Sequence, residues 1–178
     1  RVTNIFSGGI VKDITIDFSY INVLFGTGGG FGGSNNIIHP TFKLQNLVVE
    51  NQDLGTPTSA LFGGMIDYTN CRFENLVQNT TTVPFFEYVV TSTSTNCIFR
   101  NVVNNNSNKI VFSFLKGNYT INNCIFDETI GVYGQNSVIN FSKCYISVQD
   151  TFVRYSGSSN ITFNFSQCYV RNSGTNTA

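Results

Sequence analysis

Five cysteine-centred segments repeat along this 178-residue chain, and their spacing limits the folds that the chain can adopt. Successive cysteines are 26, 27, 20 and 24 residues apart, and each has Asn, Lys or Gln before it and Phe, Ile or Val two positions after it. The segments TNCRFEN, TNCIFRN, NNCIFDE, SKCYISV and SQCYVRN contain Cys71, Cys97, Cys124, Cys144 and Cys168. Self-similarity at this period predicts a solenoid, in which each repeat packs only against its neighbours.

The residue types in the repeats favour strands over helices. The chain has 24 Asn but only two Ala, and Asn competes with helix formation whereas Ala is the strongest helix former. It also has 17 Phe and 8 Tyr, which suit a pleated surface. We therefore predict an all-β fold, a parallel β-solenoid of about seven rungs with one repeat per rung and little or no α-helix.

In-register stacking of the rungs would place equivalent side chains on top of one another. Residues two apart share one face of a strand, so each cysteine and its partner at plus two should both point inward. One interior column is then the five cysteines, and the other is Phe73, Phe99, Phe126, Ile146 and Val170. Upstream of the cysteines the apolar residues lie at odd offsets, which indicates that the chain turns a corner just before each cysteine.

These residues resemble the repeats of the right-handed parallel β-helix (pectin-lyase-like) superfamily. The pairing of Gly63–Ile66 (GGMI) with Cys71–Asn75 (CRFEN) is also similar to repeats of polymorphic outer-membrane-protein adhesins, and Gly8–Val11 is a second GG-containing example. The resemblance implies a single-stranded right-handed β-helix over residues 1–178, expected to be one domain of a longer chain. It implies less about function, because one fold hosts many activities.

Charge and hydropathy argue against two classes of partner. Lys plus Arg and Asp plus Glu each number 10, so the formal net charge is zero. A nucleic-acid-binding surface needs a basic excess, and a membrane-spanning helix needs an apolar run of about 18 residues, which is missing. We therefore expect neither nucleic acid nor a membrane span.

A glycine-rich segment, residues 25–36, contains a formal GxGxxG match from Gly28 to Gly33. A dinucleotide site also needs a helix that begins directly afterwards, and Ser34–Pro40 does not start one. We expect a loop that protrudes from one rung. His39 is the only histidine and cannot by itself complete a triad or a metal site, so we predict no cofactor, no metal and no catalytic residue of this kind.

The acidic residues are the remaining candidates for chemistry, because β-helix relatives include lyases and glycosidases. Glycoside hydrolysis generally uses two carboxylates that face one bond. Only Asp127 and Glu128 are adjacent, and neighbours on a strand point to opposite faces. These two and Glu50–Asp53 are the strongest candidates for a site. We predict that the chain is not an enzyme.

The cysteines allow two interpretations. Disulfides Cys71–Cys97 and Cys124–Cys144 would suit an extracellular protein, and a Cα separation of one rung fits a disulfide. In-register stacking, however, keeps the Cβ atoms about 4.8 Å apart, beyond the usual ~3.5–4.5 Å, and an odd number leaves one thiol unpaired. We favour a column of buried free thiols that act as small hydrophobic groups.

The sequence contains six N-glycosylation sequons, all after residue 78, at Asn79, Asn105, Asn118, Asn140, Asn160 and Asn164. Asn140 and Asn164 occupy the same repeat position, four residues before a cysteine. We hypothesise that some sequons carry N-linked glycans. The alternative is that these asparagines form amide ladders along the solenoid.

Together these features predict an extracellular or cell-surface module with a structural or adhesive role. Open solenoid ends favour end-to-end stacking with copies of the chain or with flanking rungs, into a filament or matrix. Tyr145 and Tyr169, next to two cysteines, are candidates for lateral contacts or for contacts with surface polysaccharide. The alternative is a carbohydrate-binding or carbohydrate-active β-helix, lyase-like or glycosidase-like. A trimeric viral attachment fibre is a third hypothesis, disfavoured by the sequon distribution.

Overall fold

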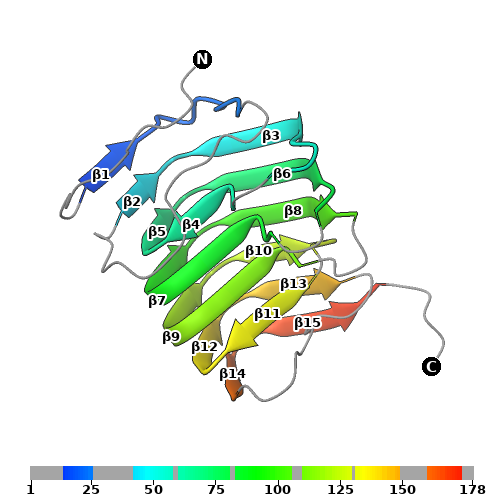
Figure 1. Cartoon of the computed structure of the whole chain (residues 1–178). Helices are drawn as coiled ribbons and strands as arrows, with labels where there is room; N and C mark the ends of the chain where they lie inside the picture. The colour runs from blue at the N-terminus through cyan, green and yellow to red at the C-terminus, as the bar shows by residue number, and fades with distance from the viewer. Residues whose placement is uncertain are drawn as a thin grey trace.

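The computed structural model describes residues 14–25, 42–57, 60–80, 83–105, 110–129, 131–148 and 160–173. Fifteen strands run through these ranges, every pair of neighbouring strands is parallel, and no helix occurs within them. Figure 1 shows the strands stacked in layers from the N-terminal to the C-terminal end. The predicted all-β parallel solenoid is confirmed.

One wall of the solenoid is a nine-stranded sheet, here called sheet A. Its main path is β1-β2-β5-β7-β9-β12-β14, with β4 paired to β7 and β11 paired to β9. The bounds are β1 Ile14–Asp17, β2 Phe42–Gln45, β4 Phe62–Gly64, β5 Ile66–Thr69, β7 Phe86–Thr95, β9 Phe112–Asn122, β11 Val132–Gln135, β12 Ser137–Ser142 and β14 Ile161–Ser166.

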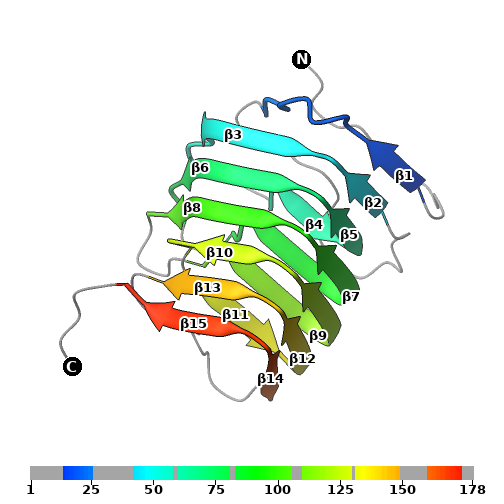
Figure 2. The same cartoon turned by 180° about the vertical axis from the view of Figure 1, so that it is seen from behind.

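The opposite wall is a six-stranded sheet, here called sheet B, in the order β15-β13-β10-β8-β6-β3 (Figure 2). The bounds are β3 Val48–Asp53, β6 Arg72–Gln78, β8 Ile98–Asn104, β10 Ile125–Asp127, β13 Tyr145–Val148 and β15 Tyr169–Asn172. Each cysteine lies between a strand of sheet A and the next strand of sheet B, so the repeat seen in the sequence marks the passage between the walls.

The residue before each cysteine makes the corner between the two sheets. All five of these residues have left-handed backbone, with φ between 52° and 55°, and they are Asn70, Asn96, Asn123, Lys143 and Gln167. Asn tolerates this conformation better than most residues because its short polar side chain can bond locally. The corner reverses the inward parity of the chain, as the change from odd to even apolar offsets predicted.

The described part of the chain forms about five turns, and the expected number of about seven is too high. Seven strands lie along the main path of sheet A, but the outermost layers are not closed. Opposite β1, sheet B is reduced to a single bridge between Asn22 and Val48. The sequence count treated every repeat as a full turn, whereas the terminal repeats contribute only part of one.

The core between the walls is built largely from aromatic rings. Phe62, Phe86 and Phe112 of sheet A stack on one another with ring centroids 5.5 and 5.0 Å apart. Their edges meet rings of sheet B, as Phe86 does with Phe99 at 5.3 Å. Stacking along the axis and edge-to-face contact across it are both favourable aromatic geometries.

The predicted glycine-rich loop, residues 25–36, lies outside the described residues except for its first residue, Phe25. His39 also lies outside them.

Candidate functional site

The second interior column predicted from the sequence pairs residue for residue. The register of sheet B joins Phe73 to Phe99, Phe99 to Phe126, Phe126 to Ile146 and Ile146 to Val170. Ring centroids of the first three are 5.2 and 4.9 Å apart, in stacked geometry. The column is therefore a packing element, and its first four members are buried.

The five cysteines form a parallel column beside the aromatic one, and all of them are free thiols. The Cys97 Sγ donates to the Thr95 carbonyl at 3.3 Å, and the Cys97 N–H donates to the Cys124 Sγ at 3.4 Å. Desolvation by burial raises the pKa of the Cys97 thiol well above its usual value. A buried protonated thiol is a weak donor and a small hydrophobic group, so Cys97 contributes packing rather than a nucleophile.

We expect a native-state thiol assay to separate Cys168 from the others. Cys168 lies in the last described layer and is only half-buried, whereas Cys71, Cys97, Cys124 and Cys144 are at most 3% exposed. A thiol reagent should therefore modify Cys168 first, and the other four only on unfolding, even when the pH is raised into the usual thiol range. Mass spectrometry of time points checks this. Rapid labelling of Cys97 in the folded protein would contradict the buried column.

Two rows of asparagine amides run along the solenoid, one at the corner between the sheets and one within sheet B. At the corner between the sheets, Asn70 donates to Asn46 at 3.3 Å, Asn96 to Asn70 at 3.2 Å, and Asn123 to Asn96 at 2.8 Å. This row ends at Asp17, whose pKa is lowered, first by the hydrogen bond from the Asn46 side chain and then by one from a backbone N–H. We call this row the corner ladder.

The second row lies within sheet B, where β3, β6 and β8 bend. There Asn75 donates to Asn51 at 2.8 Å and Asn101 to Asn75 at 3.0 Å, and all three have φ near 50°. This bend was not predicted, although the Asn four residues after Cys71 and Cys97 was a visible signal for it.

A shallow groove of about 390 Å³ follows the corner ladder on the outside of the solenoid. Its lining combines amides, a cation, two aliphatic side chains and a phenol, and consists of Asn96, Cys97, Ile98, Asn123, Cys124, Ile125, Lys143 and Tyr145. The Tyr145 ring stacks on Tyr169 with centroids 5.6 Å apart, and the Arg171 guanidinium lies 5.8 Å from the Tyr145 centroid. The groove is thus a concave outer surface with mixed chemistry.

Two of the four acidic residues singled out from the sequence form ion pairs on the outer face of sheet B. Glu50 pairs with Arg72, and Asp127 pairs with Arg100 at 3.3 Å. Asp53 instead accepts from a backbone N–H in the turn that follows β3, and Glu128 is exposed at a bend. Exposed ion pairs of this kind contribute little, typically ~0.2–1 kcal/mol each. The structure does not bring these four carboxylates together.

Two other carboxyls have raised pKa values, Asp67 and Glu87, in both cases chiefly because burial disfavours the charged form. Asp67 accepts from the Thr93 N–H at 2.7 Å, and Glu87 lies on the other side of the Val90 bend in β7. No sequence feature distinguishes these two residues from the other acidic residues. No group of three or more metal-ligating side chains occurs in the described ranges.

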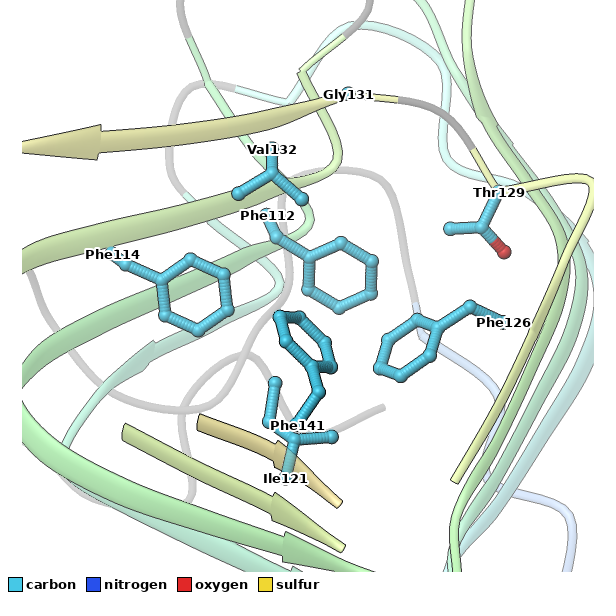
Figure 3. A pocket seen from close by; sticks show the side chains of 8 residues that line it. All are labelled: Phe112, Phe114, Ile121, Phe126, Thr129, Gly131, Val132 and Phe141. Carbon is cyan, nitrogen blue, oxygen red and sulfur yellow. The ribbon is translucent and has the colours of Figure 1, made fainter. Parts of the chain in front are cut away.

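A small cavity of about 10 Å³ lies in the interior and is shown in Figure 3. Side chains of Phe112, Phe114, Phe126, Phe141, Ile121 and Val132 converge on it, with Thr129 and Gly131 at its margin. A buried water needs about this volume and also two to four polar partners. The Thr129 hydroxyl already donates to the Phe99 carbonyl at 2.9 Å, so the cavity is a packing defect rather than a binding site.

The six sequon asparagines divide by exposure. Asn79, Asn105, Asn118, Asn160 and Asn164 are exposed, and Asn140 is half-buried. Asn140 and Asn164 lie opposite each other in register, and Asn164 donates to the Asn140 Oδ1 at 2.8 Å. The amide-ladder alternative thus describes this pair in the structure.

Fold and site together define a parallel β-solenoid with a mixed corner groove. Comparison with protein-family models, with curated proteins and with solved structures finds no match. Within the described ranges, no helix is long and apolar enough to cross a membrane. The resemblance to pectin-lyase-like proteins and to adhesin repeats therefore stays an expectation from the repeat residues, while the solenoid itself is established by the structure.

Proposed function

We propose that this chain is an extracellular structural or adhesive module whose solenoid stacks end to end with a second copy. One observation carries the proposal: the interior columns continue to the last described layer and are exposed there. Phe165 and Val170 are 46% and 50% exposed, whereas Phe141 and Ile146, which lie opposite them one layer earlier, are 3% and 0% exposed.

The opposite end of the described solenoid is also apolar. Ile21 and Leu24, beside the first layer, are 66% and 76% exposed. Since all strands run in the same direction, the edge of β14 on one copy can pair in parallel with β1 of another. Such a head-to-tail interface is heterologous and does not close, so it generates filaments. Covering the strand edges also removes a site of unspecific aggregation.

A charge placed in the open column should prevent this stacking. In the variant Phe165→Asp/Val170→Asp, stacking would have to bury two carboxylates, which is strongly unfavourable. We expect the parent protein to assemble with rising concentration and the double variant to stay monomeric, as measured by sedimentation velocity and electron microscopy. The matched control is Thr162→Asp, which adds a charge on the outer face of the same strand.

Circular dichroism must show the same strand content for all three proteins, so that loss of assembly is not loss of fold. A parent protein that stays monomeric at high concentration would overturn the end-to-end proposal. Equal assembly of the double variant and the parent would show that the contact lies elsewhere on the module.

A second candidate function is carbohydrate binding, favoured by the corner groove. Stacked Tyr145 and Tyr169 offer a ring face, and Asn96 and Asn123 offer amide groups beside it. A screen of pectin, alginate and related polymers should detect binding that Tyr145→Ala removes. The variant Arg72→Ala, on the same sheet but outside the groove lining, is the control. Turnover of a polymer would favour an enzyme over the structural role.

A further inference from the structure

We infer that the outer face of sheet A is the glycosylated face of this module, with N-linked glycans on Asn118 and Asn164 and none on Asn140. The inference rests on the proposed extracellular function and makes it more specific, because it assigns glycans to named positions on one wall. It follows from where the structure places three of the sequon amides.

These three asparagines lie on one outer face. Asn118 is on β9, Asn140 on β12 and Asn164 on β14, three strands that are neighbours in sheet A. Their chain neighbours Tyr119 and Phe141 are 1% and 3% exposed, so they point into the core. Because successive side chains alternate between faces, the asparagines point to solvent.

The hydrogen bonds distinguish Asn140 from the other two. Its Nδ2 donates to the Tyr119 carbonyl at 3.3 Å, and its Oδ1 accepts from the Asn164 Nδ2 at 2.8 Å. The Nδ2 and the Oδ1 of this half-buried amide therefore both form hydrogen bonds. A sugar on the Asn140 nitrogen would sit against the sheet surface and against Asn164, whereas Asn164 is exposed.

A glycosylated asparagine keeps one N–H on Nδ2. Asn164 can therefore carry a sugar and still donate its remaining N–H to Asn140, which preserves the ladder. Glycosylation of Asn140 and Asn164 together is excluded by distance. The two residues are partners on adjacent strands, about 4.8 Å apart, so two branched glycans would compete for the same space.

Asn118 is far enough from Asn164 for both to be occupied. Asn118 lies opposite Val138, and Val138 lies opposite Thr162, two residues before Asn164. The separation is thus two strand spacings, about 10 Å, plus an offset of two residues along the strand, about 7 Å. On sheet B the sequon asparagines Asn79 and Asn105 come just after the ends of β6 and β8, whereas the corner groove lies at the beginning of the sheet B strands.

The test is to secrete the 178-residue chain from a eukaryotic cell behind an added cleavable signal sequence. Deglycosylation in heavy-oxygen water followed by peptide mapping then reports the occupancy of each asparagine. We expect Asn118 and Asn164 to be occupied and Asn140 to be empty. Thr120→Ala should remove one glycan from the intact mass, and Asn164→Gln should remove one. The matched control Asn140→Gln should leave the mass of attached glycan unchanged.

Molecules with glycans on both Asn140 and Asn164, or secreted protein without a glycan on Asn118, would overturn the inference. This result is separable from that of the assembly experiment. A secreted chain that forms filaments without these glycans disproves the glycan assignment and leaves the proposed function standing. A chain that is glycosylated as expected but never assembles disproves the proposed end-to-end function and leaves the glycan assignment standing.

Discussion

Replacing Phe99 with Ala should lower the free energy of unfolding by about 4 kcal/mol, within the ~3–5 kcal/mol typical of a buried Phe. The Phe99 side chain is fully buried, and its ring stacks between those of Phe73 and Phe126. It also meets the edges of Phe86 and Phe112 across the core, with centroids 5.3 and 5.2 Å away. Truncation would leave a cavity that the neighbouring rungs cannot fill, because their backbones are fixed by ladder hydrogen bonds on both sides.

Urea denaturation followed by circular dichroism measures this loss. The control is Ile98→Ala, one residue earlier on β8, where the side chain is half-buried on the outer face. We expect the control to cost much less, ~1 kcal/mol, because less apolar area returns to water. A larger loss for Ile98→Ala than for Phe99→Ala would mean that the inward and outward faces of β8 have been assigned the wrong way round, and equal losses would contradict the difference in burial.

The variant Asn96→Val should lower the free energy of unfolding by about 3 kcal/mol. Asn96 has φ of 55°, a region that costs an ordinary L-residue ~1–2 kcal/mol and a β-branched residue more. The substitution also removes two hydrogen bonds of the corner ladder, to Asn70 and from Asn123, worth ~1 kcal/mol in total because these amides are exposed. Asn96→Gly loses the same hydrogen bonds but accepts the backbone, so its cost should be ~1 kcal/mol.

The difference in free energy of unfolding between Asn96→Val and Asn96→Gly gives the contribution of the left-handed backbone separately from that of the ladder hydrogen bonds. Thr15→Val, at an exposed position on β1, controls for placing valine on the surface and should be nearly neutral. If Asn96→Gly is as damaging as Asn96→Val, the ladder rather than the left-handed corner stabilises the rung. Thermal and urea unfolding of the four proteins decides between these outcomes.

Much of the architecture could be predicted because a solenoid repeats its local chemistry. The cysteine at each corner, the Asn, Lys or Gln before it and the apolar residue after it gave the period and the inward face. They also gave the pairing of Phe73 with Phe99, since in-register rungs place like on like. The number of turns was overestimated because the outermost repeats form incomplete layers.

The site was harder to predict because it lies on the outside, where the pattern is weaker. The ion pairs of Arg100 with Glu74 and Asp127 join residues 26 and 27 positions apart. These ion pairs form because the strand register places Glu74, Arg100 and Asp127 opposite one another on three successive rungs. The groove beside Asn123 and Tyr145 depends in the same way on neighbouring layers, and no short motif identifies it.

The sequence alone determined that this chain coils into a parallel β-solenoid, because alternation along a strand and repetition between rungs are both properties of local sequence. The tertiary structure alone decided which other polar groups meet across rungs: the two asparagine ladders, the ion pairs of sheet B and the corner groove. The physical reason is that side chains about 25 residues apart become neighbours about 4.8 Å apart once the strands are in register. Their hydrogen bonds and exposure are therefore set by stacking rather than by sequence neighbours.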